Sequence, residues 1–412
     1  MIVRKGYRFR IYPTPEQEVL FRRTIGACRF VRNLCLEQKV LERHRSQPRS
    51  LSAWSQGAEL GALKAELPWL REVPHHALVQ AIADLHKGFK AFFEGRTRFP
   101  QYLRKGEKES FRLPDPKQFR VKDDAIFLPK AGWVAWVRHR EIAGVLKNVT
   151  ISRSGDHWYA SVQTEAEVVD TTTNQGATIG IDLGVAKPIT LSDGTVFALP
   201  RVSTAERRHL AAAQKRMARR KKGSKNREKA RRQVARIQAK WARRRNDAAH
   251  KATTMIAKNH GVIVMEDLKV ANMARSARGT VEAPGRNVRQ KAGLNRALLD
   301  ISFGQIRSLL AYKAPLFGSR LIVVDPRNTS RTCPACGAVD AMSRKTQGVF
   351  SCVACGHADD ADVNAAINIL AKGQAMLNQI QPEDLPGMAC GSSRTSGRKQ
   401  EEDSREGRSP VL

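Results

Sequence analysis

The sequence predicts a multidomain protein that combines α/β and α+β parts and carries a small inserted metal-binding module. Three observations predict this architecture. The chain of 412 residues is long enough for two or three domains, and its 41% hydrophobic content excludes wholesale disorder. Short alternating strands cluster in the first half, whereas buried strand runs alternate with long helical segments in the second. Two close cysteine pairs lie between residues 333 and 355.

The first 105 residues are predicted to form one strand and three helices. Residues 2–12 alternate enough to indicate a strand. Thr14, Pro15 and Gln17 predict a helix start, because threonine can cap, proline suits the first turn and glutamine can complete a capping box. Helices are expected over residues 14–45, 52–65 and 76–95.

The hydrophobic period changes at about residue 110. The runs IFLP, WVAWVR, VLKNVTISR and WYASVQTEAE are typical of short strands separated by Gly, Asp and Ser turns. They predict a small β-barrel or sheet over residues 110–168. A linker is expected at 170–176.

Three buried-strand runs follow: ATIGIDLG, GVIVMEDL (261–268) and RLIVVD (320–325). Asp193 and Gly194 lie between apolar runs and predict a hairpin after the first of them. DVNAAINILAKG, after the cysteine segment, predicts a short helix.

Long helical segments connect these strands. A very basic stretch at 203–258 is split at Gly223 and Ser224, and another helix is expected at 295–315, after a polar loop at 274–290. Apolar residues recur at helical spacing on the basic stretch and can face a core: Val234, Ile237, Trp241, Ala248, Ala252 and Met255.

The charge balance points to a polyanionic partner. Lys and Arg number 72 against 39 acids, a formal net charge of +33. Such self-repulsion opposes compaction unless a polyanion neutralises it. Nucleic acid is therefore favoured over a membrane surface. No stretch predicts a membrane-spanning helix or a signal peptide, so we expect no membrane partner and a cytoplasmic, nucleoid-associated protein.

Three acids stand at the ends or edges of apolar elements: Asp182 in GIDLG, Glu266 in IVMED and Asp362 at the head of DVNAAINI. Converging carboxylates can hold two Mg²⁺ (or Mn²⁺) ions for phosphodiester hydrolysis. This order of elements is that of an RNase H-like fold: a strand hairpin, helices, an acid-bearing strand and an acid-bearing helix. Each acid also has a plainer interpretation as a strand end or helix cap, and Asp360 competes with Asp362.

The two cysteine pairs predict a zinc ribbon. Cys333 and Cys336, then Cys352 and Cys355, are two C-x2-C pairs separated by fifteen residues. A closed shell of four thiolates leaves no open position, so one zinc ion would be structural. Three further residues are not expected to bind it: His357, Cys28 and Cys35. Cys390 lies in a polar tail.

Several segments resemble, in order, the transposon-encoded TnpB (OrfB) family, relatives of type V CRISPR effectors. They are YRFRIYPTPEQ, GACRFVRN, RFPQYLRKGEKESF, GIDLGVAKPITLSDG, VMEDLKVANM, LLAYKAPLFGSRLIVVDPRNTSRTCPACG and FSCVACGHADDADVNAAINI, spread over about residues 1–372. The three RuvC acids of the family fall on Asp182, Glu266 and Asp362, and its zinc ligands on the four paired cysteines.

The resemblance also implies a domain layout. A wedge β-barrel would comprise 1–13 and 106–170, and a helical recognition domain 14–105. A RuvC-like, RNase H-like nuclease domain would comprise 171–332 and 356–374, with the inserted Cys₄ zinc ribbon at 333–355. Residues 375–412 are expected to form a disordered tail.

The implied partners are a guide RNA derived from the transposon end and double-stranded target DNA with a short adjacent motif. A partner transposase encoded by the same element is a further candidate. Candidate nucleic-acid contacts comprise strand, helix and basic-stretch residues: Arg8, Arg10, Ser55, Gln56, His75, Gln80, Arg219, Arg220, Lys221, Lys222, Arg244 and Arg245. An ordinary helix surface explains Ser55, Gln56, His75 and Gln80 equally well.

The sequence predicts an RNA-guided DNA endonuclease, and two other functions remain open. An RNA-guided regulator would bind DNA without cleaving it, and the retained acid trio weighs against that function. A transposase would use similar acids to join DNA ends.

Overall fold

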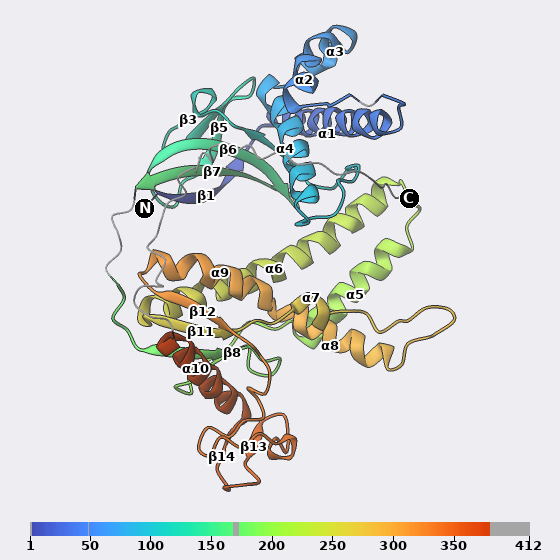
Figure 1. Cartoon of the computed structure of the whole chain (residues 1–412). Helices are drawn as coiled ribbons and strands as arrows, with labels where there is room; N and C mark the ends of the chain where they lie inside the picture. The colour runs from blue at the N-terminus through green and yellow to red at the C-terminus, as the bar shows by residue number, and fades with distance from the viewer. Residues whose placement is uncertain (1, 48, 168–172, 380–412) are drawn as a thin grey trace, which may run out of the picture.

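The computed structural model describes residues 2–47, 49–167 and 173–379. Two halves face each other, each built on its own sheet (Figure 1). The first half holds a curled seven-stranded sheet with helices on one side. The second holds a five-stranded sheet, a set of helices and, at its far end, the segment with the paired cysteines.

The seven-stranded sheet is antiparallel, in the order β2-β6-β7-β1-β5-β4-β3. Its first strand, β1 (Ile2–Tyr12), pairs along most of its length with β7 (His157–Glu167) and at its end with β5 (Gly132–Val137). This curled sheet agrees with the predicted small barrel or sheet. The other strands are β2 (Ser110–Leu113), β3 (Arg120–Val121), β4 (Ala125–Leu128) and β6 (Val145–Ser154).

Helix α1 (Pro15–Arg43) begins at the predicted capping box. The Thr14 hydroxyl accepts a hydrogen bond from the Gln17 backbone N–H at 3.3 Å, and the Gln17 side chain accepts one from the Thr14 N–H at 3.0 Å. The helix predicted at 52–65 is divided at Glu59. The remaining helices of this half are α2 (Ala53–Ala58), α3 (Leu60–Glu66), η1 (Pro68–Arg71) and α4 (His75–Phe93).

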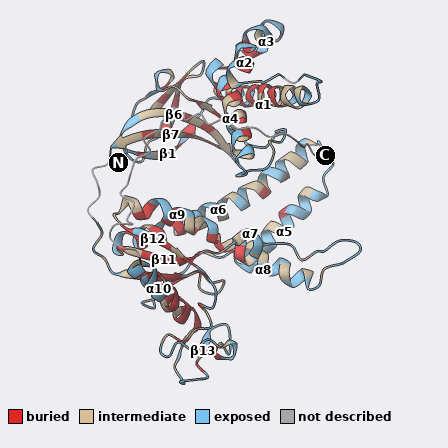
Figure 2. Ribbon diagram, in the orientation of Figure 1, coloured by how far each residue is buried: buried red, intermediate tan, exposed pale blue. Residues whose placement is uncertain are grey.

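One continuous core joins the first sheet to its helices. Phe21 of α1 is 1% exposed, and its ring centroid lies 5.3 Å from that of Trp158 and 5.8 Å from that of Phe111. Figure 2 shows buried residues along the strands and along the inner faces of α1 and α4. Aromatic contacts between helix and sheet thus fix the first half as one unit.

The second sheet has the order β10-β9-β8-β11-β12. Strands β8, β11 and β12 are parallel, whereas β9 and β10 form the predicted hairpin, in which Gly194 has a φ of +86°. The bounds are β8 (Thr178–Asp182), β9 (Ile189–Leu191), β10 (Val196–Phe197), β11 (Val262–Glu266) and β12 (Arg320–Val324).

Helices pack on both sides of this sheet. The basic stretch is split at Gly223 and Ser224, as predicted, into α5 (Thr204–Ala218) and α6 (Lys225–Asn259). On the other side, α10 (Ala361–Gln379) approaches β8 so closely that a Cβ at Gly180 would lie 2.1 Å from the Ala366 carbonyl oxygen. The remaining helices are α7 (Val270–Met273), α8 (Val288–Ile301) and α9 (Phe303–Leu316).

Three details of the second half differ from the sequence predictions. The helix expected at 295–315 begins at Val288 and is broken at Ser302, whose φ is +60°. Met255, predicted to face a core, is 54% exposed, whereas Val234 and Ala252 are buried as predicted. Neighbouring elements cover only part of the apolar face of α6. Apolar spacing alone therefore overestimates how many of its residues are buried.

The ends of several predictions fall at the limits of the described residues. Residues 375–379, expected to start the tail, form the end of α10. Residues 380–412, with Cys390, and residues 168–172 of the expected linker lie outside the described residues. Among the helices that the structure describes, none is both long and apolar enough to pass through a lipid bilayer.

Candidate functional site

The three predicted acids lie at one edge of the second sheet. Asp182 is the last residue of β8 and Glu266 the last residue of β11. These strands are parallel neighbours, with Ile181 opposite Met265, so their carboxyl ends meet. Asp362 lies in the first turn of α10, which packs against both strands. Three segments distant in sequence thus deliver one carboxylate each to the same edge.

The electrostatics of these acids show that they share one environment. The pKa of Asp182 is raised to about 7, first by burial and then by the charges of Glu266 and Asp362, while Arg344 opposes the shift. Burial also raises the pKa of Glu266 and of Asp362. Desolvation and mutual repulsion both disfavour the charged forms, so a bound cation would relieve both.

Neighbouring acids are already engaged by the protein. Asp360 accepts hydrogen bonds from the backbone N–H groups of Asp362 at 3.1 Å and Val363 at 3.3 Å, and it pairs with Lys187 at 2.6 Å. It therefore acts as a cap for the first turn of α10. Asp267, the residue after Glu266, forms an ion pair with Arg307 and is half exposed.

The donor chemistry of the trio fits hard divalent cations. Carboxylate oxygens are the ligands that Mg²⁺ prefers, at about 2 Å. Two ions about 4 Å apart can accept oxygens spread over roughly 8 Å, so the donors need not touch one another. Within the described ranges, only the paired cysteines form a group whose ligand atoms all lie within 4.8 Å of one another. The carboxylates are more widely spread than this thiolate cluster.

The four cysteines form a compact tetrad. The sulfurs of Cys333 and Cys355 are 3.6 Å apart, as are those of Cys336 and Cys352. Gly337 and Gly356 close the two turns with φ values of +75° and +74°, a backbone conformation that suits glycine. The tetrad fits a structural metal ion such as zinc.

Among the described residues, Cys28, Cys35 and His357 are not part of the tetrad. Cys28 and Cys35 are buried in the core of the first half, where burial raises the pKa of Cys28 to about 12 and that of Cys35 to about 11. Such thiols are protonated and packed.

The segment that holds the tetrad continues through β13 (Val349–Ser351) and β14 (Ala358–Asp360), a hairpin that leads directly into α10.

Some of the predicted nucleic-acid contacts are exposed, whereas others are paired with groups of the protein itself. Arg219, Arg220, Lys221 and Lys222 are exposed at the turn between α5 and α6. Two other arginines of α6 are paired within the protein: Arg244 with Glu206 at 2.9 Å and Arg245 with Asp300 at 3.0 Å. On the first sheet, Arg8 lies over the Tyr159 ring at 3.9 Å, and Arg10 lies 2.9 Å from His157.

The candidate motif contacts on the helices have intramolecular partners. Gln56 is 2% exposed and donates to the Cys35 carbonyl at 2.9 Å. Gln80 is 9% exposed and donates to Asp84 at 2.7 Å. Ser55 completes the capping box of α2, and His75, which is exposed, lies 2.8 Å from the Lys64 ammonium.

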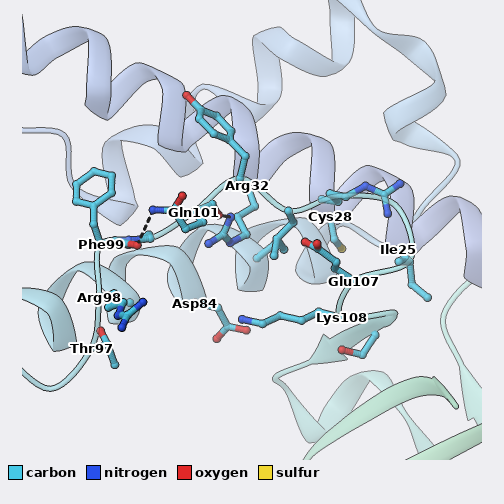
Figure 3. A pocket seen from close by; sticks show the side chains of 17 residues that line it. Ile25, Cys28, Arg32, Asp84, Thr97, Arg98, Phe99, Gln101, Glu107 and Lys108 are labelled. Atoms are coloured by element: carbon cyan, nitrogen blue, oxygen red, sulfur yellow. Dashed lines mark hydrogen bonds between the residues drawn. The ribbon is translucent and has the colours of Figure 1, made fainter. Parts of the chain in front are cut away.

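A cavity of about 510 Å³ opens between α1, α4 and the loop that follows α4 (Figure 3). Arg29 and Arg32 of α1 line it together with Arg98 and Lys108 of the loop, and Asp84 of α4 lies among them. The sequence reasoning missed both α1 arginines, because they look like an ordinary helix surface until the loop folds over them.

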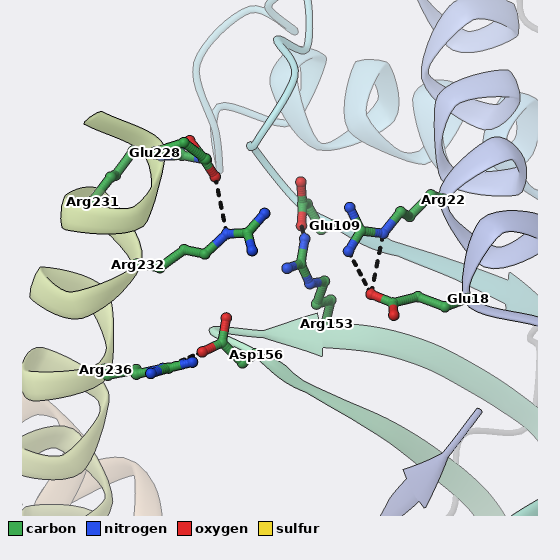
Figure 4. A network of polar contacts seen from close by, with 9 residues as sticks. All are labelled: Glu18, Arg22, Glu109, Arg153, Asp156, Glu228, Arg231, Arg232 and Arg236. Carbon is green, nitrogen blue, oxygen red and sulfur yellow. Dashed lines mark hydrogen bonds and ion pairs between the residues drawn. The ribbon is translucent and has the colours of Figure 1, made fainter. Parts of the chain in front are cut away.

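A larger cavity of about 740 Å³ lies between the two halves, with walls from α1, the loop at 105–109, β6, β7 and α6. Figure 4 shows arginines from three of these segments pointing toward one another, Arg22, Arg153 and Arg232, with Arg231 beside Glu228 on α6. Carboxylates separate them, since Glu109 lies 3.5 Å from Arg153 and Glu228 lies 2.9 Å from Arg231. The sequence shows these basic residues but not their convergence.

Comparison with known proteins gives three family matches. Residues 161–277 match the IS605 OrfB model, described as a probable transposase, and residues 303–369 match a Cas12f1-like TNB domain. Residues 1–45 match the helix-turn-helix domain of the same OrfB group. In the structure, that last range holds strand β1 and the single helix α1.

Two curated relatives cover almost the whole chain. One, "Putative RNA-guided DNA endonuclease InsQ" of Escherichia coli (strain K12), is 39% identical over 396 residues, 96% of each chain. Another, "Putative RNA-guided DNA endonuclease" of Streptomyces pristinaespiralis, is 33% identical over 99% of this chain and 96% of the relative.

Among solved structures, a Cas12f1–sgRNA–target DNA complex aligns with 90% of this chain and 99% of its own, at 13% identity and a TM-score of 0.47. That likeness is too distant to carry a conclusion. The identities of 39% and 33% to the two curated relatives extend over almost the whole chain and are sufficient to assign the family. The chain belongs to the transposon-encoded TnpB (OrfB) family.

Proposed function

We propose that this protein is an RNA-guided DNA endonuclease of a mobile element, in which Asp182, Glu266 and Asp362 hold the catalytic metal ions. One observation carries the assignment: carboxylates from β8, β11 and α10 share one sheet edge, and the charges of Glu266 and Asp362 help to raise the pKa of Asp182. The names of the curated relatives support the same activity.

The order of the second sheet supports an RNase H-like nuclease domain. A hairpin follows the first acid-bearing strand, and parallel strands β11 and β12 extend the sheet on its other side. The helix that covers this sheet brings the third acid. This arrangement agrees with the order of elements expected from the sequence.

Two Mg²⁺ or Mn²⁺ ions at this edge would activate a water molecule against a target phosphate and stabilise the leaving oxygen. The chain's own part is to bring its three carboxylates to one sheet edge, where burial raises their pKa values and disfavours their ionised forms until cations bind. Arg344, 3.8 Å from Asp362, adds positive charge beside the acids. The products would be a 5′-phosphate and a 3′-hydroxyl.

The nucleic-acid partners would be a guide RNA from the transposon end and target DNA with a short adjacent motif. The cavity between the two halves supports a path for their phosphates, because Arg22, Arg153 and Arg232 point toward one another across it and Arg231 also lines it. The exposed turn at 219–222 extends the basic surface along α5 and α6.

The deciding test is cleavage of a plasmid by the protein purified with its own RNA. We expect cleavage that needs both the RNA and Mg²⁺ and that is lost in Asp182→Ala. Cleavage by that variant would refute the catalytic role. RNA-dependent binding without cleavage by the wild type would favour a regulator, and joined DNA ends formed without RNA would favour a transposase.

A further inference from the structure

A short segment between β12 and the first cysteine is fastened to α10. Residues 325–332 form a turn in which Asn328 has a φ of +64° and accepts the backbone N–H of Thr332 at 3.0 Å. The segment follows strand β12 of the sheet and ends just before Cys333. It therefore connects the acid-bearing sheet to the cysteine tetrad.

Three side chains of α10, spaced four residues apart, hold this segment by its carbonyl oxygens. Asn364 donates to Thr332, Asn368 to Thr329 and Thr332, and Lys372 to Asp325 and Arg327, at distances from 2.5 to 3.1 Å. Residues at this spacing share one helix face. Asn364 and Asn368 are buried, so the fastening is shielded from water.

The segment presents one hydroxyl to a predicted metal ligand. The Thr329 Oγ1 donates to Glu266 Oε1 at 2.5 Å, and Thr329 and Glu266 are only 3% and 9% exposed. Oγ1 also lies 3.0 Å from the Pro326 carbonyl oxygen, but a hydroxyl has one hydrogen, and the closer, charged oxygen is the stronger acceptor. This bond fixes the orientation of the Glu266 carboxylate.

Helix α10 is thereby linked to two of the three acids. It carries Asp362 directly, and through Asn368 it anchors the turn that holds Glu266. We propose that Thr329 is a positioning residue that orients Glu266 for metal binding and that Asn368 anchors it. This inference rests on the proposed function, because it gives Glu266 a metal ion to bind. Outer groups that orient metal ligands typically contribute 10- to 100-fold to affinity or activity.

The test compares Thr329→Val, which keeps the shape and removes the hydroxyl, with Thr329→Ser, which keeps the hydroxyl. Thr332→Val is the matched control, because the Thr332 hydroxyl bonds only to the Asn328 carbonyl in the same turn. Mn²⁺ affinity is measured on the zinc-loaded, full-length protein by electron paramagnetic resonance of free Mn²⁺. Cleavage rate is then measured against Mg²⁺ and DNA concentration with the RNA complex.

We expect Thr329→Val to weaken Mn²⁺ binding and to raise the half-saturating Mg²⁺ concentration by about tenfold or more, with the KM for DNA unchanged. In Thr329→Ser and Thr332→Val, the Mn²⁺ affinity and the half-saturating Mg²⁺ concentration should stay within about twofold of the wild-type values. Both variants keep a hydroxyl that donates to Glu266. If Thr329→Val fails to fold, Thr329→Ala against Thr329→Ser makes the same comparison.

Wild-type metal binding in Thr329→Val, or equal losses in Thr329→Ser or Thr332→Val, would overturn the positioning role. A different result would instead overturn the proposed function: a wild type that binds Mn²⁺ but never cleaves DNA with its RNA. The Mn²⁺ measurement still judges Thr329 in that case, so the two failures are distinguishable.

Discussion

The two halves of the molecule differ in what they bury. The first half has one continuous apolar core, and its buried Thr24 and Gln56 bond to nearby backbone carbonyls. The second half divides its apolar residues among three smaller clusters and buries ionisable groups, including Glu266, Asp362 and Lys313. The comparison teaches that the first half is held by apolar packing, whereas the second half buries charged groups only with specific partners beside them.

Not every buried charge of the second half belongs to the site. The Lys313 ammonium on α9 donates to the His250 carbonyl and to the Thr253 and Thr254 hydroxyls of α6 at 2.6 to 2.8 Å. Burial lowers its pKa to about 8. Lys313 is surrounded by acceptors, which makes it a structural link, whereas Asp182 lies near two acids whose charges raise its pKa.

The largest expected effect separates two adjacent acids. Glu266→Gln should reduce RNA-guided cleavage to background, because the amide cannot replace the buried carboxylate as a cation ligand. Asp267→Asn is the matched control, since Asp267 is half exposed and pairs with Arg307. It should retain cleavage of the wild-type order in a plasmid assay. Loss of cleavage in both variants would remove the distinction between site and surface.

Removal of the tetrad metal should damage the second half alone. We expect Cys352→Ser to abolish cleavage, because Cys352 is buried within the tetrad and the segment 333–355 leads directly into α10 with Asp362. Limited proteolysis should then cut near residues 333–355 while the fragment with the first sheet survives. Cys35→Ser, a thiol of the other core, should leave this pattern unchanged.

The pKa of Asp182 predicts a stability effect with a definite sign. Its folded pKa is raised from 3.8 to about 7, so ionisation destabilises the folded state as pH rises from about 4 to 7. At pH 8 in chelator, Asp182→Asn should therefore raise stability, by at most about 4 kcal/mol at 1.36 kcal/mol per pKa unit.

Denaturant unfolding at two pH values checks this prediction. The advantage of Asp182→Asn should shrink toward pH 4, where the folded carboxyl is protonated and the pH lies close to the ordinary value of 3.8. Saturating Mg²⁺ should favour the wild type instead, because only its carboxylate binds the ion. A variant less stable than the wild type at pH 8 in chelator would contradict the raised pKa.

The smallest expected effect concerns the cavity between the halves. Replacing Arg232 by Gln should lower the slope of log affinity against log salt for RNA by about 0.7 to 0.9, the value of one phosphate contact. Arg244→Gln is the control, because Arg232 lines this cavity and Arg244 does not, although both have an acidic partner, Glu228 and Glu206. Filter binding over a range of salt concentrations measures both slopes. Equal slopes for Arg232→Gln and the wild type would exclude Arg232 from the phosphate path.

The sequence predicted the features that depend on local pattern. Strand ends pointed to Asp182 and Glu266, and the start of the helix DVNAAINI pointed to Asp362 or Asp360, because element type and edge can be read from periodicity. The cysteine spacing alone predicted the tetrad. The capping box at Thr14 was confirmed for the same reason.

Features that depend on distant packing could not be predicted in this way. The bond from Thr329 to Glu266 joins residues 63 positions apart, and the cavity arginines come from α1, β6 and α6. Gln56 and Gln80 resembled surface residues, but tertiary contacts bury them. Their contact with DNA stays a prediction and would require them to leave their present partners.

The division of the cores between the halves has a practical consequence. The apolar core of the first half is drawn from residues 7–162 and those of the second from 179–369, with no residue in common. A gene cut between codons 167 and 173 would leave each hydrophobic interior whole. Reassembly of the two polypeptides with and without the proposed guide RNA would then show whether that RNA holds the halves together.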